Sequence, residues 1–495
     1  MTLVFDNSTA FDALQYETLD QYGESFHVVV CKIGYSLGPV ANRPSDNAPG
    51  WATLSELRDA APILDEDAYF GEMHRSGVRM ESDLSPYKPR CDVIVNASAW
   101  APQGKPVAQF SVRLIVQSPS TAAPLPEAPC GLNPMMPPSE QALVEWRRQT
   151  AAARQIRIPG ARLIDKTLQV TGERFLLREG SSSNWALTEP QPFTHLPLHH
   201  EVAFGGECRI NAGDDAAARV PASARLSAEQ LAGHPDCAAP RAMQPVAHTA
   251  CEYNLLGCGY AQNWYLHATQ SRQLSAPRVQ YPHHPFSASL FADIAAGGDN
   301  HPAIPAAVAG LGCIGRAWLP RRQLIGSFEA KAHYADDEYP QLPRDFDFGY
   351  WNCAPRDQQC AHLRGDEEFA LINLCAPDSP HATINDQMDT QLCFQLPGHV
   401  FYLAVGDEDE RIGVKPMLID TVTIDMEQNR IEVVWRAVIS TEARLCDAQL
   451  RFAKTPADME KLHALLTLQQ ALGQPEVNQT GMSNAANLNE VPHGA

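Results

Sequence analysis

The strongest strand signal in the chain lies at residues 25–37, which read Ser-Phe-His-Val-Val-Val-Cys-Lys-Ile-Gly-Tyr-Ser-Leu. It is a dense run of β-branched and aromatic residues, which strands favour because such side chains pack well on a pleated, half-buried surface. We therefore predict a strand here. Two similar runs near the other end of the chain, residues 420–425 and 430–436, predict two more strands around a turn at 426–429.

Between these ends the sequence predicts two further pairs of strands. Residues 92–99 and 107–117 flank a Pro/Gly turn, a pattern typical of a hairpin. Residues 161–170 and 173–177 flank a Thr-Gly turn and are expected to pair in the same way. The alternation of apolar and polar residues at the start of 110–116 indicates one buried face.

Helices are expected to be few and short. Residues 141–154 are rich in good helix formers, and the apolar residues of 456–472 recur at helical spacing. Tracts rich in proline, alanine or aspartate cover 118–140, 208–250 and 270–310, and we expect long irregular loops there.

These elements predict a mainly β protein with antiparallel, sandwich-like sheets, long irregular loops and few short helices. Helices between strands are too sparse for a doubly wound parallel sheet. We expect an N-terminal β-rich domain over 1–200 and a second β-rich part of the same unit over 201–440. A helix and a flexible tail are expected over 441–495.

Composition excludes several classes of function. A net charge of −20 repels phosphate backbones and anionic lipid surfaces, so we expect neither nucleic acid binding nor membrane insertion. The first twenty residues have no basic segment followed by an apolar one, so no signal peptide is expected, and no window reaches the ~18 apolar residues of a membrane span. Thirteen scattered cysteines fit reduced thiols in a cytoplasmic protein.

The segment from His199 through His200 to Glu201 first suggests a metal site. Neighbouring residues of a strand point to opposite faces, so at most His199 and Glu201 share one. No helical His-Glu-x-x-His pattern is present, and packed or solvated histidines are the preferred interpretation. The glycine pair at 205–206 more plausibly allows a bulge than a phosphate cradle.

Other catalytic patterns fail on their surroundings. Ser36 matches the centre of a Gly-x-Ser-x-Gly elbow, but nearby prolines exclude the helix that the elbow must open. Ser85 and Lys88 match Ser-x-x-Lys, but the proline between them breaks the helical turn. The cysteines lack the two-residue spacing of zinc knuckles. The sequence therefore predicts neither a metal nor another cofactor.

Asp345 and Asp347 form the best acid pair, because two residues apart on an extended segment places both carboxylates on one side. Such a pair suits a metal or a glycosidase-like site. The preferred interpretation is that these aspartates cap turns by accepting backbone N–H bonds.

Nine short strings occur in order along the chain. They are residues 69–71, 78–93, 101–106, 197–206, 254–260, 315–321, 342–347, 352–358 and 363–367. Together they resemble the bacterial domain-of-unknown-function family 2169, over about residues 20–440.

The resemblance implies an adaptor or chaperone of the type VI secretion system. Such proteins are similar to factors that bind and stabilise an effector carrying a PAAR tip domain and help to load it on the VgrG spike. The insertions at 118–154 and 208–250 are then candidates for client specificity. Residues of the strings are expected to be hydrogen-bonding nodes that fix turns, or a rim that contacts the client: Asp83, Lys88, Glu201, Phe204, Gly205, Gly206, Asp345, Phe346, Asp347, Asp357, Gln358 and Asp366.

Two other functions remain open at this point. One is a metal-dependent hydrolase that uses Asp345, Asp347, His199 and Glu201. The other is a secreted effector, which the absence of a toxin-like region after residue 456 disfavours. The adaptor is the preferred hypothesis, and we expect no enzymatic activity.

Overall fold

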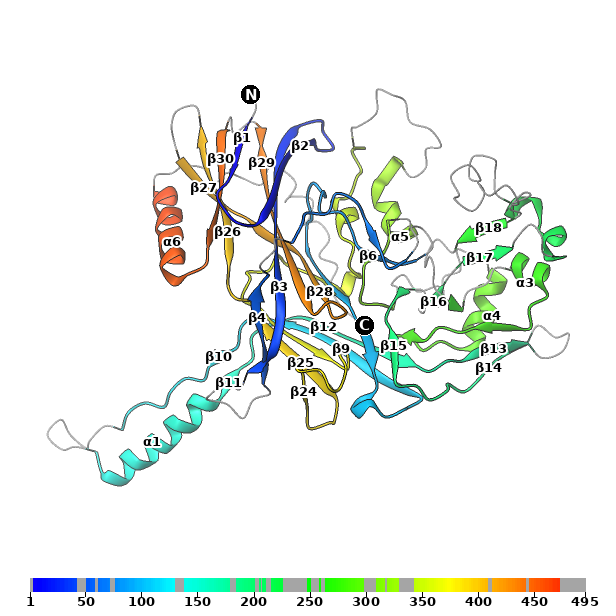
Figure 1. The fold of residues 1–495 in the computed structure, drawn as a ribbon, viewed down its shortest axis with the longest axis horizontal. Coiled ribbons are helices and arrows are strands. Elements are labelled where there is room, and N and C mark those ends of the chain that lie inside the picture. The colour runs from blue at the N-terminus through cyan, green and yellow to red at the C-terminus, as the bar shows by residue number, and fades with distance from the viewer. Residues whose placement is uncertain are drawn as a thin grey trace.

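Three β-sheets enclose the core of the protein (Figure 1). The structure is a computed structural model. It describes residues 3–41, 50–57, 61–71, 76–129, 138–178, 184–200, 204–205, 207–210, 215–225, 247–250, 258–259, 263–297, 309–316, 318–328, 342–407, 412–441 and 445–471. No helix in these ranges is both long and apolar enough to cross a bilayer.

The largest sheet has seven strands and joins both ends of the chain. Its order is β2 (Asp12–Leu19), β3 (Ser25–Ala41), β29 (Arg430–Ser440), β28 (Leu418–Asp425), β7 (Cys91–Asn96) and β22 (Gln359–Cys360), with β4 (Trp51–Glu56) also paired to β3. The pairing is antiparallel except between β28 and β7, which are parallel. The strands predicted from 25–37, 420–425 and 430–436 are confirmed and are neighbours here.

Two further sheets complete the scaffold. The six-stranded one has the order β21 (Val279–Gln280), β12 (Arg162–Thr171), β9 (Gln109–Gln117), β23 (Glu368–Ile372), β25 (Thr390–Gln395) and β24 (Thr383–Ile384). The four-stranded one has the order β1 (Val4–Asn7), β30 (Leu445–Ala453), β26 (Val400–Asp407) and β27 (Ile412–Pro416). The mainly β fold with largely antiparallel pairing is therefore confirmed.

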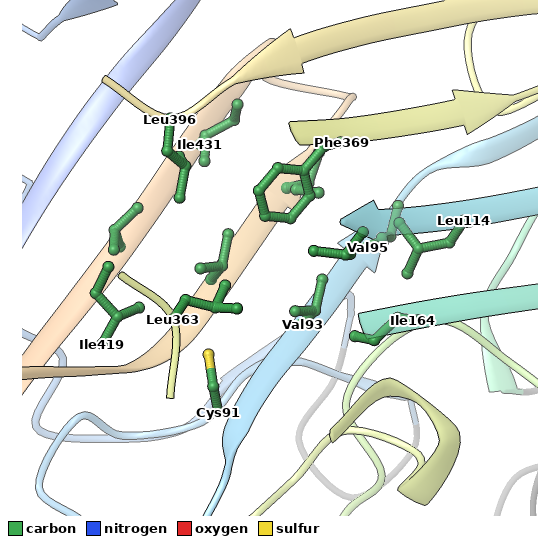
Figure 2. Close-up of a cluster of buried hydrophobic side chains, with 14 of the residues drawn as sticks. Cys91, Val93, Val95, Leu114, Ile164, Leu363, Phe369, Leu396, Ile419 and Ile431 are labelled. Carbon is green, nitrogen blue, oxygen red and sulfur yellow. The ribbon is translucent and has the colours of Figure 1, made fainter. Parts of the chain in front are cut away.

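The main core lies where these sheets face one another. Figure 2 shows Val93 and Val95 of β7 meeting Leu114 of β9 and Phe369 of β23. All four side chains are buried, and they alternate along their strands with residues of the opposite face. Strands from both sides of residue 200 thus build one continuous core.

Both predicted hairpins are wrong in their pairing. Strand β7 pairs with β28 and β22, whereas β9 pairs with β12 and β23. The short strand β8 (Ser98–Trp100) and a tight turn, in which Gln103 and Gly104 have positive φ, carry the chain from one sheet to the other. Strand β8 itself pairs with β15 (His195–Pro197).

The second predicted hairpin fails because of Gly172. This residue lies so close to another chain segment that a Cβ there would be 1.6 Å from the Gln191 carbonyl oxygen. Past it the chain leaves β12 for a separate small sheet of β13 (Phe175–Arg178), β14 (Trp185–Leu187) and β20 (Gln273–Ser275).

Small strand pairs and short helices surround the sheets. The remaining pairs are β5 (Ala68–Tyr69) with β6 (Val78–Met80), β10 (Thr121–Ala122) with β11 (Arg157–Ile158), β16 (Phe204–Gly205) with β19 (Cys258–Gly259), and β17 (Glu207–Ile210) with β18 (Ala247–Ala250). The helices are α1 (Glu140–Gln155), α3 (Asn263–Thr269), α4 (Ala288–Gly297), α5 (Leu319–Arg322) and α6 (Pro456–Ala471).

The predicted helices at 141–154 and 456–472 are confirmed as α1 and α6. Helix α6 lies along β27, where the Val414 N–H donates to Gln469 Oε1 at 2.9 Å. The tract 270–310 is less irregular than predicted, because it contains α4 and two short strands. Each of the two largest sheets contains strands from before and from after the boundary predicted at residue 200. The division into domains stays a prediction.

Candidate functional site

The face of the seven-stranded sheet that points away from the core is charged. Lys32 on β3 and Glu432 and Arg436 on β29 alternate with apolar residues of the core face. These charged side chains are buried, and residues 80–83, Lys88 and Cys353 border the small cavity beside them. We call this buried set the ionic layer: Lys32, Glu81, Asp83, Lys88, Asp92, Arg321, Asp420, Glu432 and Arg436.

Asp92 is the most connected member of the ionic layer. Its carboxylate accepts bonds from Lys88 Nζ at 3.0 Å, Asn352 Nδ2 at 3.1 Å, and the backbone N–H groups of Cys353 and Ala354 at 3.0 and 3.2 Å. Burial alone would lower the pKa of the Lys88 amine, but the nearby Asp92 and Asp420 carboxylates and the hydrogen bond to Asp92 together raise it. Two of the nine strings, 78–93 and 352–358, therefore meet at a fully buried ion pair.

Asp83 performs a similar task over the strands β3 and β29. Its carboxylate accepts from Lys32 Nζ at 3.0 Å and from the Leu64 N–H at 2.8 Å, and Lys32 also contacts Glu432 at 2.8 Å. The Asp83 carbonyl accepts from Arg436 Nη2 at 2.9 Å. These bonds fasten residues 61–64 and 82–85 to the sheet.

Glu81 and Arg321 form a third buried pair. Arg321 Nη2 donates to Glu81 at 2.7 Å, while its Nε and Nη1 donate to the carbonyls of Tyr350 and Ile314 at 2.7 and 2.6 Å. The cavities bordering the ionic layer measure about 20 Å³ each, the space of roughly one water. A substrate does not fit there, so the layer holds segments together.

Asp345 and Asp347 are exposed, and each holds a turn. Asp345 Oδ1 accepts from the Ser327 hydroxyl at 3.0 Å, and bonds from Ser327 lower the pKa of this carboxyl. Asp347 Oδ1 accepts from the Gly349 N–H at 2.8 Å and caps the short helix η7 (Phe348–Trp351). Phe346 between them is buried and packs edge-on against Phe348.

The contacts of His199 are with residues outside the suggested metal site. Its ring stacks on Phe70 with the centroids 3.8 Å apart, and its Nε2 is 4.0 Å from Glu427 Oε1. Glu201 and Gly206 lie outside the described residues, while Phe204 and Gly205 form β16. Within the described ranges, no group of three His, Cys, Asp or Glu residues is arranged to hold a metal. The hydrolase alternative stays a prediction with no supporting contact.

Asp357 and Gln358 meet a buried lysine that the sequence interpretation missed. Lys166 Nζ lies 2.8 Å from Asp357 Oδ1 and 2.8 Å from Gln358 Oε1, and the Tyr281 hydroxyl donates to Asp357 at 3.0 Å. Burial lowers the pKa of Lys166 to about 8, against the opposing effect of Asp357. The signal was present: Lys166 occupies a core-facing position between Ile164 and Leu168 in a period-two pattern.

Gln358 and Asp366 join backbone segments. Gln358 Nε2 donates to the carbonyls of Val93 and Leu311 at 2.8 and 2.9 Å. The Asp366 carbonyl accepts from Gln395 Nε2 at 2.9 Å. Among the described residues, Phe346 thus packs in the interior and Asp347 caps its own turn. The side chains that bond to other segments are those of Asp83, Lys88, Asp345, Asp357 and Gln358.

The exposed apolar side chains lie elsewhere, and the largest group is on a projecting segment. We call residues 118–129 and 138–160 the arm, which runs out along β10, includes α1 and returns along β11 (Figure 1). Of the twelve large apolar residues that are exposed in the described ranges, four belong to the arm: Leu125 (52% exposed), Val144 (58%), Ile156 (55%) and Ile158 (46%).

Local bonds keep the arm extended. Ser139 caps α1 by accepting from the Ala142 N–H at 3.2 Å, and Trp146 Nε1 donates to the Pro126 carbonyl at 2.9 Å. At the base, a Cβ on Gly160 would lie 2.1 Å from the Ser118 carbonyl oxygen, so the close approach of the two chains requires glycine.

A groove of about 400 Å³ opens near the ends of the large sheets. Trp100 of β8, residues 374–381 after β23, and the turn 426–429 between β28 and β29 line it. His195 stacks on the Trp100 ring at a centroid distance of 5.0 Å.

Comparison with known proteins gives one result. No curated protein and no solved structure matches the chain. One family model, described as an uncharacterized protein conserved in bacteria (DUF2169), matches residues 23–123 and 143–436. The match covers well over half of the chain and every one of the nine strings, and it is interrupted only within the arm. The chain therefore belongs to the DUF2169 family.

Proposed function

We propose that this protein is a cytoplasmic adaptor that binds a PAAR-type effector of the type VI secretion system, stabilises it and helps to load it on the VgrG spike. The family resemblance of the nine strings suggests the system. The distribution of charged and apolar side chains supports the mode of action, which is binding of another polypeptide.

The observation that carries the proposal is the arm. Contact of water with large apolar side chains along a projecting segment is unfavourable, and a partner that covers them removes that contact. Burying apolar surface is worth about 25 cal/mol per Å², so a few such residues supply much of the affinity of a modest interface. Leu125, Val144, Ile156 and Ile158 are arranged in this way.

The ionic layer supports the same proposal from the other direction. The polar residues of the strings form hydrogen bonds with backbone groups and with one another. The cavity beside them is the size of a water molecule. The family pattern is thus accounted for by a rigid scaffold. A rigid scaffold lowers the entropy cost of presenting a binding segment.

The interruption of the family match supports a place for client selection. It spans residues 124–142, whose described part belongs to the arm. A segment that departs from the common family pattern and carries the exposed Leu125 is suited to recognising a client particular to this protein.

The test is co-expression with the product of the neighbouring gene that encodes a PAAR domain. The effector is expected to co-elute with this protein in size-exclusion chromatography, and to be degraded or insoluble when expressed alone. A strain lacking this gene is expected to secrete no effector. An effector that is soluble, intact and secreted in that strain would overturn the proposal.

A further inference from the structure

The groove beside Trp100 has the size of a binding site. Its volume of about 400 Å³ falls within the ~300–1,000 Å³ of typical ligand pockets, and it is larger than the two cavities that border the ionic layer. The string 101–106 directly follows Trp100 in the chain. No role in this groove was predicted for any of the nine strings.

The walls of the groove are held by the backbone of both large sheets. The Trp100 N–H donates to the Asn373 carbonyl at 2.9 Å, and the Met426 N–H donates to the Asn96 carbonyl at 2.8 Å. Asn373 is buried and adopts a positive φ, which fixes the direction of the chain that follows it. The groove therefore exists before any ligand arrives.

The lining combines an apolar floor with negative charge. Trp100, Leu374 and Met426 supply apolar surface, Asp378 and Glu427 supply two exposed carboxylates, and no lysine or arginine is among the lining residues. Glu427 lies 3.6 Å from Arg79 and is partly neutralised by it. Asp378 is exposed and has no ion pair or hydrogen bond among the described residues, so no described cation of the protein neutralises its charge.

An aromatic ring beside carboxylates is the chemistry that binds a guanidinium or ammonium group. The ring attracts the cation through its negative face, and the carboxylates accept its N–H bonds. One face of Trp100 is covered by His195, which leaves the rest of the indole to border the groove. The net charge of −20 adds long-range attraction for a basic segment.

We propose that this groove binds an arginine or lysine side chain presented by a basic segment of a polypeptide. The assignment of that segment to the effector rests on the proposed function above. The affinity of the groove for a basic peptide does not depend on it. The groove and the arm then hold the same client at two separate places.

The experiment uses the full chain and a fluorescein-labelled peptide, Gly-Arg-Gly-Arg-Gly, with Gly-Glu-Gly-Glu-Gly as the charge-reversed probe. Fluorescence anisotropy is expected to show binding of the arginine peptide that weakens with salt, and no binding of the glutamate peptide. The double variant Asp378→Asn/Glu427→Gln is expected to lose about tenfold in affinity, a typical effect of removing ionic partners.

A matched variant controls for net charge. Glu66→Gln/Glu140→Gln removes two exposed carboxylates that do not line the groove, and it is expected to bind the arginine peptide as the wild type does. Trp100→Leu, checked for folding by circular dichroism, is expected to weaken binding in the same way. Equal affinity in all variants, or equal binding of the two peptides, overturns the proposal.

Co-expression separates this inference from the adaptor proposal. The Asp378→Asn/Glu427→Gln variant is expected to retain less effector than Glu66→Gln/Glu460→Gln, which removes two exposed carboxylates outside both the groove and the arm. Full retention overturns the assignment of the groove to the client and leaves the adaptor proposal intact. Failure of the wild-type protein to retain any effector overturns the adaptor proposal, while peptide affinity alone decides the chemistry of the groove.

Discussion

The ionic layer and the arm place their side chains in opposite environments. In the layer, groups such as Lys88 and Asp92 are charged yet buried, whereas on the arm Val144 and Ile156 are apolar yet exposed. A buried charge is tolerated only when it is paired, so each member of the layer depends on the others. An exposed apolar residue has no such dependence, which leaves the arm free to vary without loss of the fold.

Removing Asp92 is expected to have the largest effect on stability. Asp92→Ala leaves the Lys88 ammonium buried without its partner and should lower the free energy of unfolding by about 3–5 kcal/mol. Lys88→Met/Asp92→Leu, which removes both charges, should lose less than Asp92→Ala alone. Urea denaturation followed by circular dichroism measures both.

The exposed pair Arg113–Asp165 provides the matched control. Its side chains are 2.7 Å apart but largely open to water, and Asp165→Ala should cost about 1 kcal/mol or less. An equal loss of stability in Asp92→Ala and Asp165→Ala would contradict the structural role of the layer.

The buried Lys166 makes the free energy of unfolding depend on pH. Its pKa is lowered from about 10.5 in the unfolded chain to about 8 in the fold. Between these values the unfolded chain binds more protons, so the contribution of Lys166 to stability rises with pH. The free energy of unfolding of the wild type, relative to Lys166→Met, should therefore increase by about 1.5 kcal/mol from pH 8 to pH 9.5.

Denaturation of both proteins at several pH values measures this difference. Gln169→Met on the same strand serves as the control, because it removes no titrating group and should show no such trend. A difference that stays constant or falls as pH rises would show that Asp357 holds Lys166 charged throughout the range.

On the arm, substitutions should separate binding from stability. Val144→Ser/Ile156→Ser should change the free energy of unfolding by less than about 0.5 kcal/mol, since both side chains are exposed. The same variant should retain several-fold less effector on co-expression. Leu465→Ser/Leu468→Ser, which alters two exposed apolar residues of α6, is the matched control and should retain the effector. Equal retention by both variants would remove the arm from the interface.

The smallest effect is expected at the exposed turn. Asp345→Asn keeps an oxygen that accepts from the Ser327 hydroxyl, so the denaturation midpoint should not change measurably. Elemental analysis of the wild type and of Asp347→Asn should find no stoichiometric metal in either protein. A metal that is present in the wild type and lost in Asp347→Asn would favour the hydrolase alternative over the adaptor.

Local sequence patterns predicted the elements of this fold better than their partners. The β-branched run in β3 and the helical spacing in α6 are read from neighbouring residues, and both elements formed as expected. The partner of β7 is β28, more than three hundred residues away, and no turn between them encodes that choice. Close backbone approaches, such as that of Gly172 to Gln191, also have no local signal.

The candidate residues show the same limit. The strings containing Asp83, Lys88 and Gln358 were identified, but their partners were not, since Lys32 and Lys166 lie on distant strands. Buried charged residues on one face of a β-branched strand, such as Glu432 and Arg436 in β29, indicate that another segment covers that face. The groove at Trp100 is lined from three separate parts of the chain and leaves no contiguous pattern.

The pairing of β3 with β29 has a consequence for synthesis in the cell. Residues 25–41 pair with the nearby strands β2 and β4, but their third partner, residues 430–440, lies near the other end of the chain. Contacts so distant in sequence slow folding and keep apolar strands exposed meanwhile. The seven-stranded sheet is therefore completed only near the end of translation.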